Sequence, residues 1–186
     1  MGLLSALKSR FFPPELCRVA KIGDVSAIAQ CMAGTSVVVI GRDLGDSVPF
    51  DAGQGVITAI VEAAAEKKSF DGDIHKYEIE GETFLPVFTD TAAAESFCGA
   101  YVSLLGHIHA FRLFEVPGAF IRKWIADDDI IVINPQCSNE VEIDKGKSES
   151  VCRSIAETDD LSGARFVSVA LPMLGISQPI DFGPDP

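Results

Sequence analysis

The residues best suited to metal or nucleophilic chemistry are one cysteine and two histidines near the middle of the chain. His107 and His109 are two positions apart, so in a strand both side chains would lie on one face, and Cys98 precedes them in a predicted helix. Imidazole and thiolate are ordinary zinc ligands and also a possible base and nucleophile, with His75 as another base. A fourth ligand is not evident, and no spacing selects one cysteine and histidine pair. The alternative is exposed or hydrogen-bonded histidines and a buried apolar cysteine.

A run of three acidic residues could hold a divalent cation. Asp127, Asp128 and Asp129 follow a predicted helix, and carboxylates are the ligands that magnesium prefers. Negative charge at a helix C-terminus opposes the helix dipole, so some compensation is expected. Water or a nearby lysine would compensate the run equally well, and we therefore assign neither a metal nor a cofactor to the chain.

A short glycine pattern is the only candidate for holding a phosphate group. Gly53 and Gly55 flank Gln54 at the start of a predicted helix, where backbone N–H groups can bind an anion. The third glycine of a dinucleotide motif is missing, and no clear strand precedes the pattern. The pattern is therefore weak evidence for a phosphate-binding site.

These residues must be positioned by a central stretch that alternates strand and helix. The apolar run 84–88 is typical of a strand, and Thr89 and Asp90 favour the start of a helix. Residues 108–116 alternate and predict a strand with one face largely buried, followed by a helix that begins near Pro117. The run 130–133 is apolar throughout, as in a central strand covered on both faces.

Two short motifs in this stretch resemble the SseB family, specifically its N-terminal domain. They are Leu85-Pro86-Val87-Phe88-Thr89 and Ile133-Asn134-Pro135, and the resemblance covers roughly residues 15–145. The family is largely uncharacterised and consists mainly of cytoplasmic bacterial proteins. The resemblance therefore implies a fold and a location, and it transfers no catalytic residue.

The rest of the chain adds further elements to this stretch. Two helices are expected between residues 15 and 33, with a break at Gly23 and Asp24, and they are followed by a strand at 36–40. Residues 56–68 form an amphipathic helix that Asp51 would cap, and a hairpin turning at Gly81 precedes residue 84.

We therefore predict an α/β (α+β) fold, with a mixed β-sheet of about five strands and helices packed on its faces. Residues 1–14 would form an N-terminal arm and residues 15–145 an SseB-like domain. Residues 146–186 would form an extension with one strand, near residue 164, and a proline-rich tail.

Pro86 gives the predicted strand 84–88 a possible role in binding. Proline lacks the N–H that a central strand uses, so it favours an edge strand or a bulge. An edge strand can accept a strand from a partner. Phe84, Pro86 and Phe88 are thus the candidate interaction edge, for a protein partner or for a second copy of the chain.

Charge and cysteine content limit the classes of partner and compartment. The chain has 186 residues, is 47% apolar, and carries a net charge of −12, which repels phosphate backbones and anionic lipid. We expect no nucleic acid and no membrane partner. The five cysteines contain no C-x-x-C pair, which fits reduced thiols in a cytoplasm.

Two functions of different classes remain open. The first is a non-enzymatic protein-binding or regulatory module of the SseB-like kind, which acts through an edge strand and an acidic surface. The second is a small-molecule-binding or metal-binding enzyme with a pocket near Cys98, His107 and His109. The absence of a clear catalytic constellation in the sequence favours the first.

Overall fold

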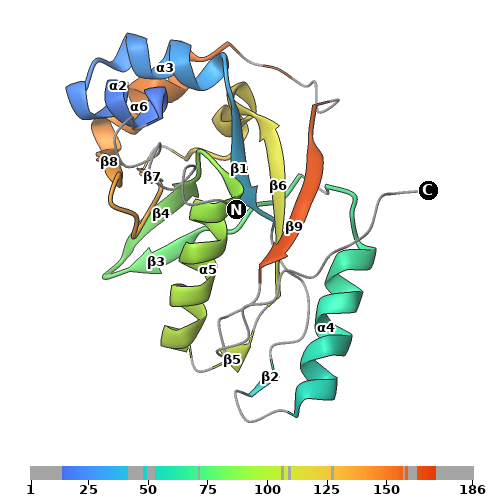
Figure 1. The fold of residues 1–186 in the computed structure, drawn as a ribbon. Helices are drawn as coiled ribbons and strands as arrows, with labels where there is room; N and C mark the ends of the chain where they lie inside the picture. The colour runs from blue at the N-terminus through green and yellow to red at the C-terminus, as the bar shows by residue number, and fades with distance from the viewer. Residues whose placement is uncertain are drawn as a thin grey trace.

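Figure 1 shows the fold in a computed structural model, which describes residues 14–41, 48–49, 53–70, 72–105, 107–108, 110–126, 128–156, 158 and 163–170. In chain order the elements are α2 (Glu15–Ile22), α3 (Val25–Ala33), β1 (Ser36–Ile40), β2 (Val48–Pro49), α4 (Gln54–Glu66), β3 (Tyr77–Ile79), β4 (Glu82–Val87), α5 (Thr91–Leu105), β5 (His107–Ile108), β6 (Phe111–Pro117), the 3-10 helix η1 (Gly118–Lys123), β7 (Ile130–Ile133), β8 (Val141–Ile143), α6 (Lys145–Ser154) and β9 (Arg165–Ala170).

The longest strand, β6, is the centre of a three-stranded sheet. It pairs antiparallel with β1 on one side and with β9 on the other. The predicted strand 108–116 was expected to bury one face, but residues 111–114 are buried on both. Phe111 and Leu113 face α5, whereas Phe114 packs against Phe70 with ring centroids 5.0 Å apart.

A second sheet has the strand order β3-β4-β7-β8. β4 and β7 are parallel, and the chain between them passes through α5, β5, β6 and η1. The predicted hairpin is confirmed: β3 and β4 are antiparallel, and Glu80 and Gly81 form its turn with φ of 54° and 82°. Two consecutive positive φ values are typical of a two-residue hairpin turn. The central position of β7 is also confirmed.

The fold class is the predicted combination of helices and sheets, but the number of sheets was wrong. The described strands form sheets of three and four strands and a separate pair, β2 and β5, instead of one mixed sheet of about five. The two main sheets meet where Phe88 and Val38 exchange backbone hydrogen bonds of 2.8 and 2.9 Å. The run 84–88 therefore belongs to both sheets, because its last residue leaves β4 and joins β1.

Local sequence signals explain most of the helix boundaries. The predicted break between α2 and α3 is confirmed: Gly23 has a φ of 78°, and the Asp24 carboxylate accepts hydrogen bonds from the backbone N–H groups of Ser26 and Ala27. α5 begins as predicted, since Asp90 accepts from the Ala93 N–H at 2.9 Å. The helix expected from Pro117 is only the short 3-10 helix η1.

The C-terminal elements are part of the same packed body. α6 packs against α3, and β9 completes the three-stranded sheet beside β6. α5 contacts all three strands of that sheet, and α4 contacts β9. Figure 1 shows α4 at one end of the molecule. Residues 1–13 and 171–186 lie outside the described part of the chain.

Candidate functional site

The predicted interaction edge is not an edge. β4 lies between β3 and β7, Pro86 and Phe88 are buried, and Phe84 is half-buried beneath the stacked ring of Tyr77. The prediction was wrong because a proline weakens a sheet only where its missing N–H would have met a partner. The backbone of Phe88 bonds to β1, and the backbone groups of residues two apart in a strand point to the same side of it. The Pro86 nitrogen therefore points to the same side as Phe88. On that side the neighbouring strand changes from β3 to β1, so no N–H is needed at Pro86.

The structure does not assemble a nucleophile from Cys98. Its side chain is fully buried in the apolar cluster between α5 and β6, and this burial raises the pKa of the thiol. A reactive cysteine needs the reverse, a lowered pKa and access to substrate. The His75 ring packs against Phe111, with centroids 5.4 Å apart. His107 pairs through its backbone with Pro49, and His109 lies outside the described residues.

The acidic run is divided between different environments. Asp129 is buried and its carboxylate pairs with Lys76 at 2.5 Å, while also accepting from the Ala126 N–H at 2.8 Å. Asp128 is exposed, and Asp127 lies outside the described residues. Lys76 thus compensates the negative charge of Asp129, which was the predicted alternative to a bound metal ion. Across the described part of the chain, no group of three or more His, Cys, Asp and Glu side chains is arranged to hold a metal ion.

The glycine pattern has no special geometry either. Gly53 precedes the first residue of α4, and no side-chain cap accompanies it. A Cβ atom on Gly53 or Gly55 would meet nothing within 4 Å, so no close approach requires glycine there.

The two motifs that carry the family resemblance meet in a buried polar network. The side-chain Oδ1 of Asn134 accepts from the Thr89 N–H at 2.8 Å. Its side-chain Nδ2 donates to the Thr89 hydroxyl at 2.9 Å and to the Cys17 sulfur at 3.3 Å. Asn134 is fully buried with a φ of 50°, a conformation that asparagine adopts more readily than most residues. Burial raises the pKa of Cys17 to about 11. The network fixes where α2, β4 and β7 meet.

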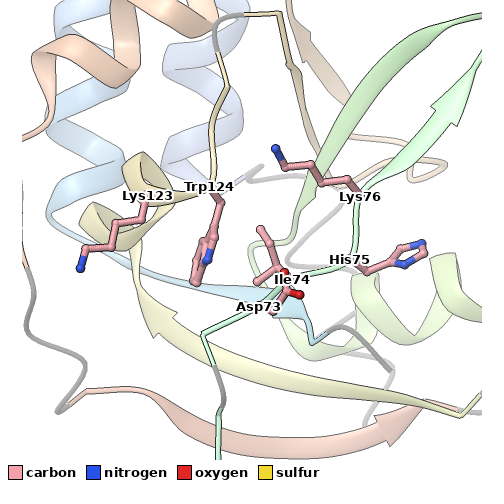
Figure 2. Close-up of a pocket in the computed structure, with 6 residues that line it drawn as sticks. All are labelled: Asp73, Ile74, His75, Lys76, Lys123 and Trp124. Carbon is pink, nitrogen blue, oxygen red and sulfur yellow. The ribbon is translucent and has the colours of Figure 1, made fainter. Parts of the chain in front are cut away.

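A cavity of about 470 Å³ lies beside η1. It is lined by Asp73, Ile74, His75, Lys76, Lys123 and Trp124. Figure 2 shows that the His75 and Lys123 side chains point in opposite directions, away from the centre of the group. The Trp124 indole N–H donates to the Gly72 carbonyl at 2.8 Å, and Lys76 is bound to Asp129. Two of the polar groups that line this cavity, on Trp124 and Lys76, are therefore engaged in local structure.

The outermost strands differ in charge. β3 carries Glu78 and β8 carries Glu142, but β9 contains no acidic residue and its one cation, Arg165, bonds to Glu115. No strand in the described part of the chain pairs with the outer side of β9. The middle of β9 is half-buried and contains Phe166, Val167, Ser168 and Val169. Among the described strands, β9 is thus the longest weakly charged sheet edge.

The sequence predicted the strand that begins near residue 164 but did not identify it as an edge. Its only signal was composition: residues 166–170 contain no charge in a chain that has 27 acidic residues. Val167 has no register partner in β6, because a bulge shifts the pairing between Leu113 and Phe114. No pattern in the sequence marks this irregularity.

No protein-family model, curated protein or solved structure matches the chain. The resemblance to the SseB family stays a prediction. Within the described residues, no helix has both the length and the apolar composition needed to span a bilayer. All five cysteines are free thiols.

Proposed function

We propose that this chain is a non-enzymatic protein-binding module, of the kind that the SseB resemblance implies, and that it binds its partner by strand addition at β9. The observation that carries the proposal is that β9 is an outer strand without acidic residues, next to no further strand of the described chain. An outer strand offers unpaired N–H and C=O groups to an extended segment of another protein.

The charge of the chain supports β9 over the outer strands β3 and β8. β1, the other outer strand of its sheet, is uncharged, but its outer side already bonds to the backbone of Phe88 and His75. A net charge of −12 opposes close approach of another acidic protein, and charged residues on an edge discourage pairing. Glu78 and Glu142 place such charges within β3 and β8. The partner segment expected at β9 is extended and apolar at alternate positions, so that it can pack beside Phe166 and Val169. A second copy of the chain would dimerise through the same edge.

The bulge at Val167 limits how this edge is used. A bulge breaks the regular ladder and increases the local twist, which restricts pairing to short segments. A short partner segment is therefore expected, bound on one side of the bulge.

A matched pair of lysine substitutions tests the proposal. Val167→Lys places a charge on β9, whereas Ile79→Lys places the same charge on β3, where Ile79 is already 53% exposed. We expect partner capture, or self-association in analytical ultracentrifugation, to be lost with Val167→Lys and kept with Ile79→Lys. Circular dichroism checks that both variants fold.

The same two variants show which result would contradict strand addition at β9. Equal binding by both variants would exclude β9 as the docking strand. Hydrogen exchange adds a direct measurement, since the backbone amides of residues 165–170 must become more protected in the complex. Unchanged exchange there, in a complex that survives purification, also contradicts strand addition.

The second candidate function is small-molecule binding, and one observation favours it: the cavity beside η1 has a volume within the usual range for ligand sites. Trp124 lines this cavity and is the only tryptophan of the chain, so its fluorescence reports on the site. Native mass spectrometry of protein purified without chelators would reveal a bound molecule. A bare mass would leave this candidate without support, and a bound molecule that does not change Trp124 fluorescence would place the ligand elsewhere.

A further inference from the structure

The cavity beside η1 has a charged group that is held in a fixed position, the ammonium of Lys76. Lys76 Nζ donates to the Asp129 carboxylate at 2.5 Å, and this carboxylate also accepts from the Ala126 N–H at 2.8 Å. A lysine ammonium has three N–H donors, so Lys76 keeps two beyond the one that Asp129 accepts. The Lys76 side chain is 28% exposed and lines the cavity. It can therefore donate to a bound anion without breaking its ion pair.

Trp124 forms an aromatic wall of the same cavity. Its indole N–H donates to the Gly72 carbonyl at 2.8 Å, and its ring packs against Phe70 and Phe120 with centroids 5.6 and 5.3 Å apart. These contacts fix the plane of the indole. Both phenyl rings meet it at an angle, 85° for Phe70 and 56° for Phe120, so neither is stacked on its face. A flat ring of a ligand in the cavity can therefore lie against the indole.

The ammonium and the indole come from different segments of the chain but line one cavity. Lys76 directly precedes β3, and Trp124 directly follows η1. Figure 2 shows that the Lys76 side chain extends toward Trp124, whereas the Lys123 side chain points away. The Lys123 ammonium lies 5.0 Å from the centroid of the Phe120 ring. Among the described residues that line the cavity, Lys76 is thus the cation that a ligand would meet.

The charges around the cavity favour a ligand with a single negative charge. The cavity is lined by Lys76, Lys123 and Asp73, and Asp129 is bound to Lys76, so the two cations are matched by two carboxylates. The chain as a whole carries a net charge of −12, which opposes a dianion such as a phosphate monoester more than a monoanion. Arginine, which binds phosphate through two parallel hydrogen bonds, is not among the described lining residues. A carboxylate is therefore the anion that fits.

The volume of the cavity limits the size of the ligand. At about 470 Å³ it lies in the lower half of the range of about 300–1,000 Å³ that is usual for ligand sites. Ile74 adds an apolar side chain to the lining, beside the Trp124 indole. A molecule with one aromatic ring or a fused pair of rings suits this space better than a nucleotide does.

We propose that the cavity beside η1 binds a small aromatic carboxylate, with its ring against Trp124 and its carboxylate at the Lys76 ammonium. This inference rests on the second candidate function, small-molecule binding at this cavity, and adds the chemical class of the ligand. The two contacts act together, so a molecule that has only the aromatic ring or only the carboxylate binds more weakly.

Three related compounds separate the two contacts in the full-length protein. Benzoate has both the ring and the carboxylate, benzamide has the same ring without the charge, and cyclohexanecarboxylate has the charge without an aromatic ring. Isothermal titration calorimetry should give a Kd for benzoate that is about five- to tenfold lower than the Kd of either other compound. Benzoate should also change the fluorescence of Trp124, the only tryptophan of the chain.

Two variants test the role of the Lys76 ammonium. Lys76→Met combined with Asp129→Asn removes the cation and also neutralises its partner, so that no buried carboxylate is left unpaired. This double variant should weaken benzoate binding about tenfold and leave benzamide binding unchanged. Lys123→Met is the matched control: it removes a cation that lies over Phe120, and it should weaken benzoate binding less than about threefold. Circular dichroism checks that both variants fold.

The contrary results are distinct from a failure of the second candidate function. Equal affinity for benzoate and benzamide, with a change in Trp124 fluorescence, would keep small-molecule binding at the cavity but overturn the carboxylate assignment. Benzoate binding that survives in the double variant would place the anion elsewhere and overturn it too. If none of the three compounds binds, the proposal is overturned, whereas native mass spectrometry still tests whether a ligand of another class is bound. The comparison of compounds needs no variant, so it holds however the double variant folds.

Discussion

Asn134→Ala is the substitution that tests most directly how the ends of β4 and β7 and the helix α2 are held together. The Asn134 side chain bonds to the backbone and hydroxyl of Thr89 and to the sulfur of Cys17, in a fully buried position. Removing it leaves the Thr89 N–H without its acceptor, which costs about 2 kcal/mol. Alanine at a φ of 50° adds about 1 kcal/mol. We expect a total loss of about 3 kcal/mol in the free energy of unfolding.

Two further variants separate these contributions. Asn134→Gly also removes the side chain but tolerates the positive φ, so it should be about 1 kcal/mol more stable than Asn134→Ala. Gln136 has a φ of 62° but is exposed, so Gln136→Ala should change stability by less than about 0.5 kcal/mol. Urea unfolding followed by circular dichroism gives all four values. A loss below about 1 kcal/mol for Asn134→Ala, or a less stable glycine variant, would refute the reasoning.

Three other perturbations test separate contacts. Gly118→Ala should destabilise the fold by about 3 kcal/mol or prevent folding, because its Cβ would lie 2.0 Å from the Met32 carbonyl oxygen, and thermal unfolding measures this. Lys76→Met should lower the free energy of unfolding by about 2 kcal/mol, because it leaves the buried Asp129 carboxylate without its cation. Asp129→Asn should lower it less, because asparagine still accepts from the Ala126 N–H. Equal losses for the two variants would contradict the ion-pair argument. Folding raises the pKa of Cys17 from 9.0 to about 11, so folding favours the protonated thiol. Its contribution to the free energy of unfolding is fully present below pH 9 and is smaller by about 1 kcal/mol at pH 10. Cys17→Ala should lack that part of the decline in alkaline urea titrations.

Elements with a clear period could be predicted from the sequence, whereas contacts between distant residues could not. The apolar runs of β4 and β7 and the cap of α5 are local signals, and the structure contains all three. Thr89 and Asn134 are 45 positions apart, so their hydrogen bonds depend on the parallel pairing of β4 with β7. No spacing in one sequence reveals that pairing.

The failure of the edge prediction has the same origin. Proline in a strand excludes one hydrogen bond, and the sequence cannot say on which side of the sheet that bond would lie. In the fold, the strand beside β4 changes at Pro86 from β3 to β1, and this arrangement involves residues that are widely separated along the chain. Similarly, the apolar pattern of α4 predicted a helix but not how much of its surface the sheet would cover.

The two main sheets are interleaved along the chain, and this order has a consequence for biosynthesis. β1, β6 and β9 build one sheet, while β3, β4, β7 and β8 build the other between them. β6 lies between β4 and β7 along the chain, so neither sheet is formed by a segment that lacks strands of the other, and the two should melt in a single cooperative transition. Because β9 is the last of the described strands along the chain, a nascent chain keeps one side of β6 open until residues 165–170 have been made. Such a chain has an unpaired, aggregation-prone edge during translation, and this edge is protected only when β9 pairs with β6.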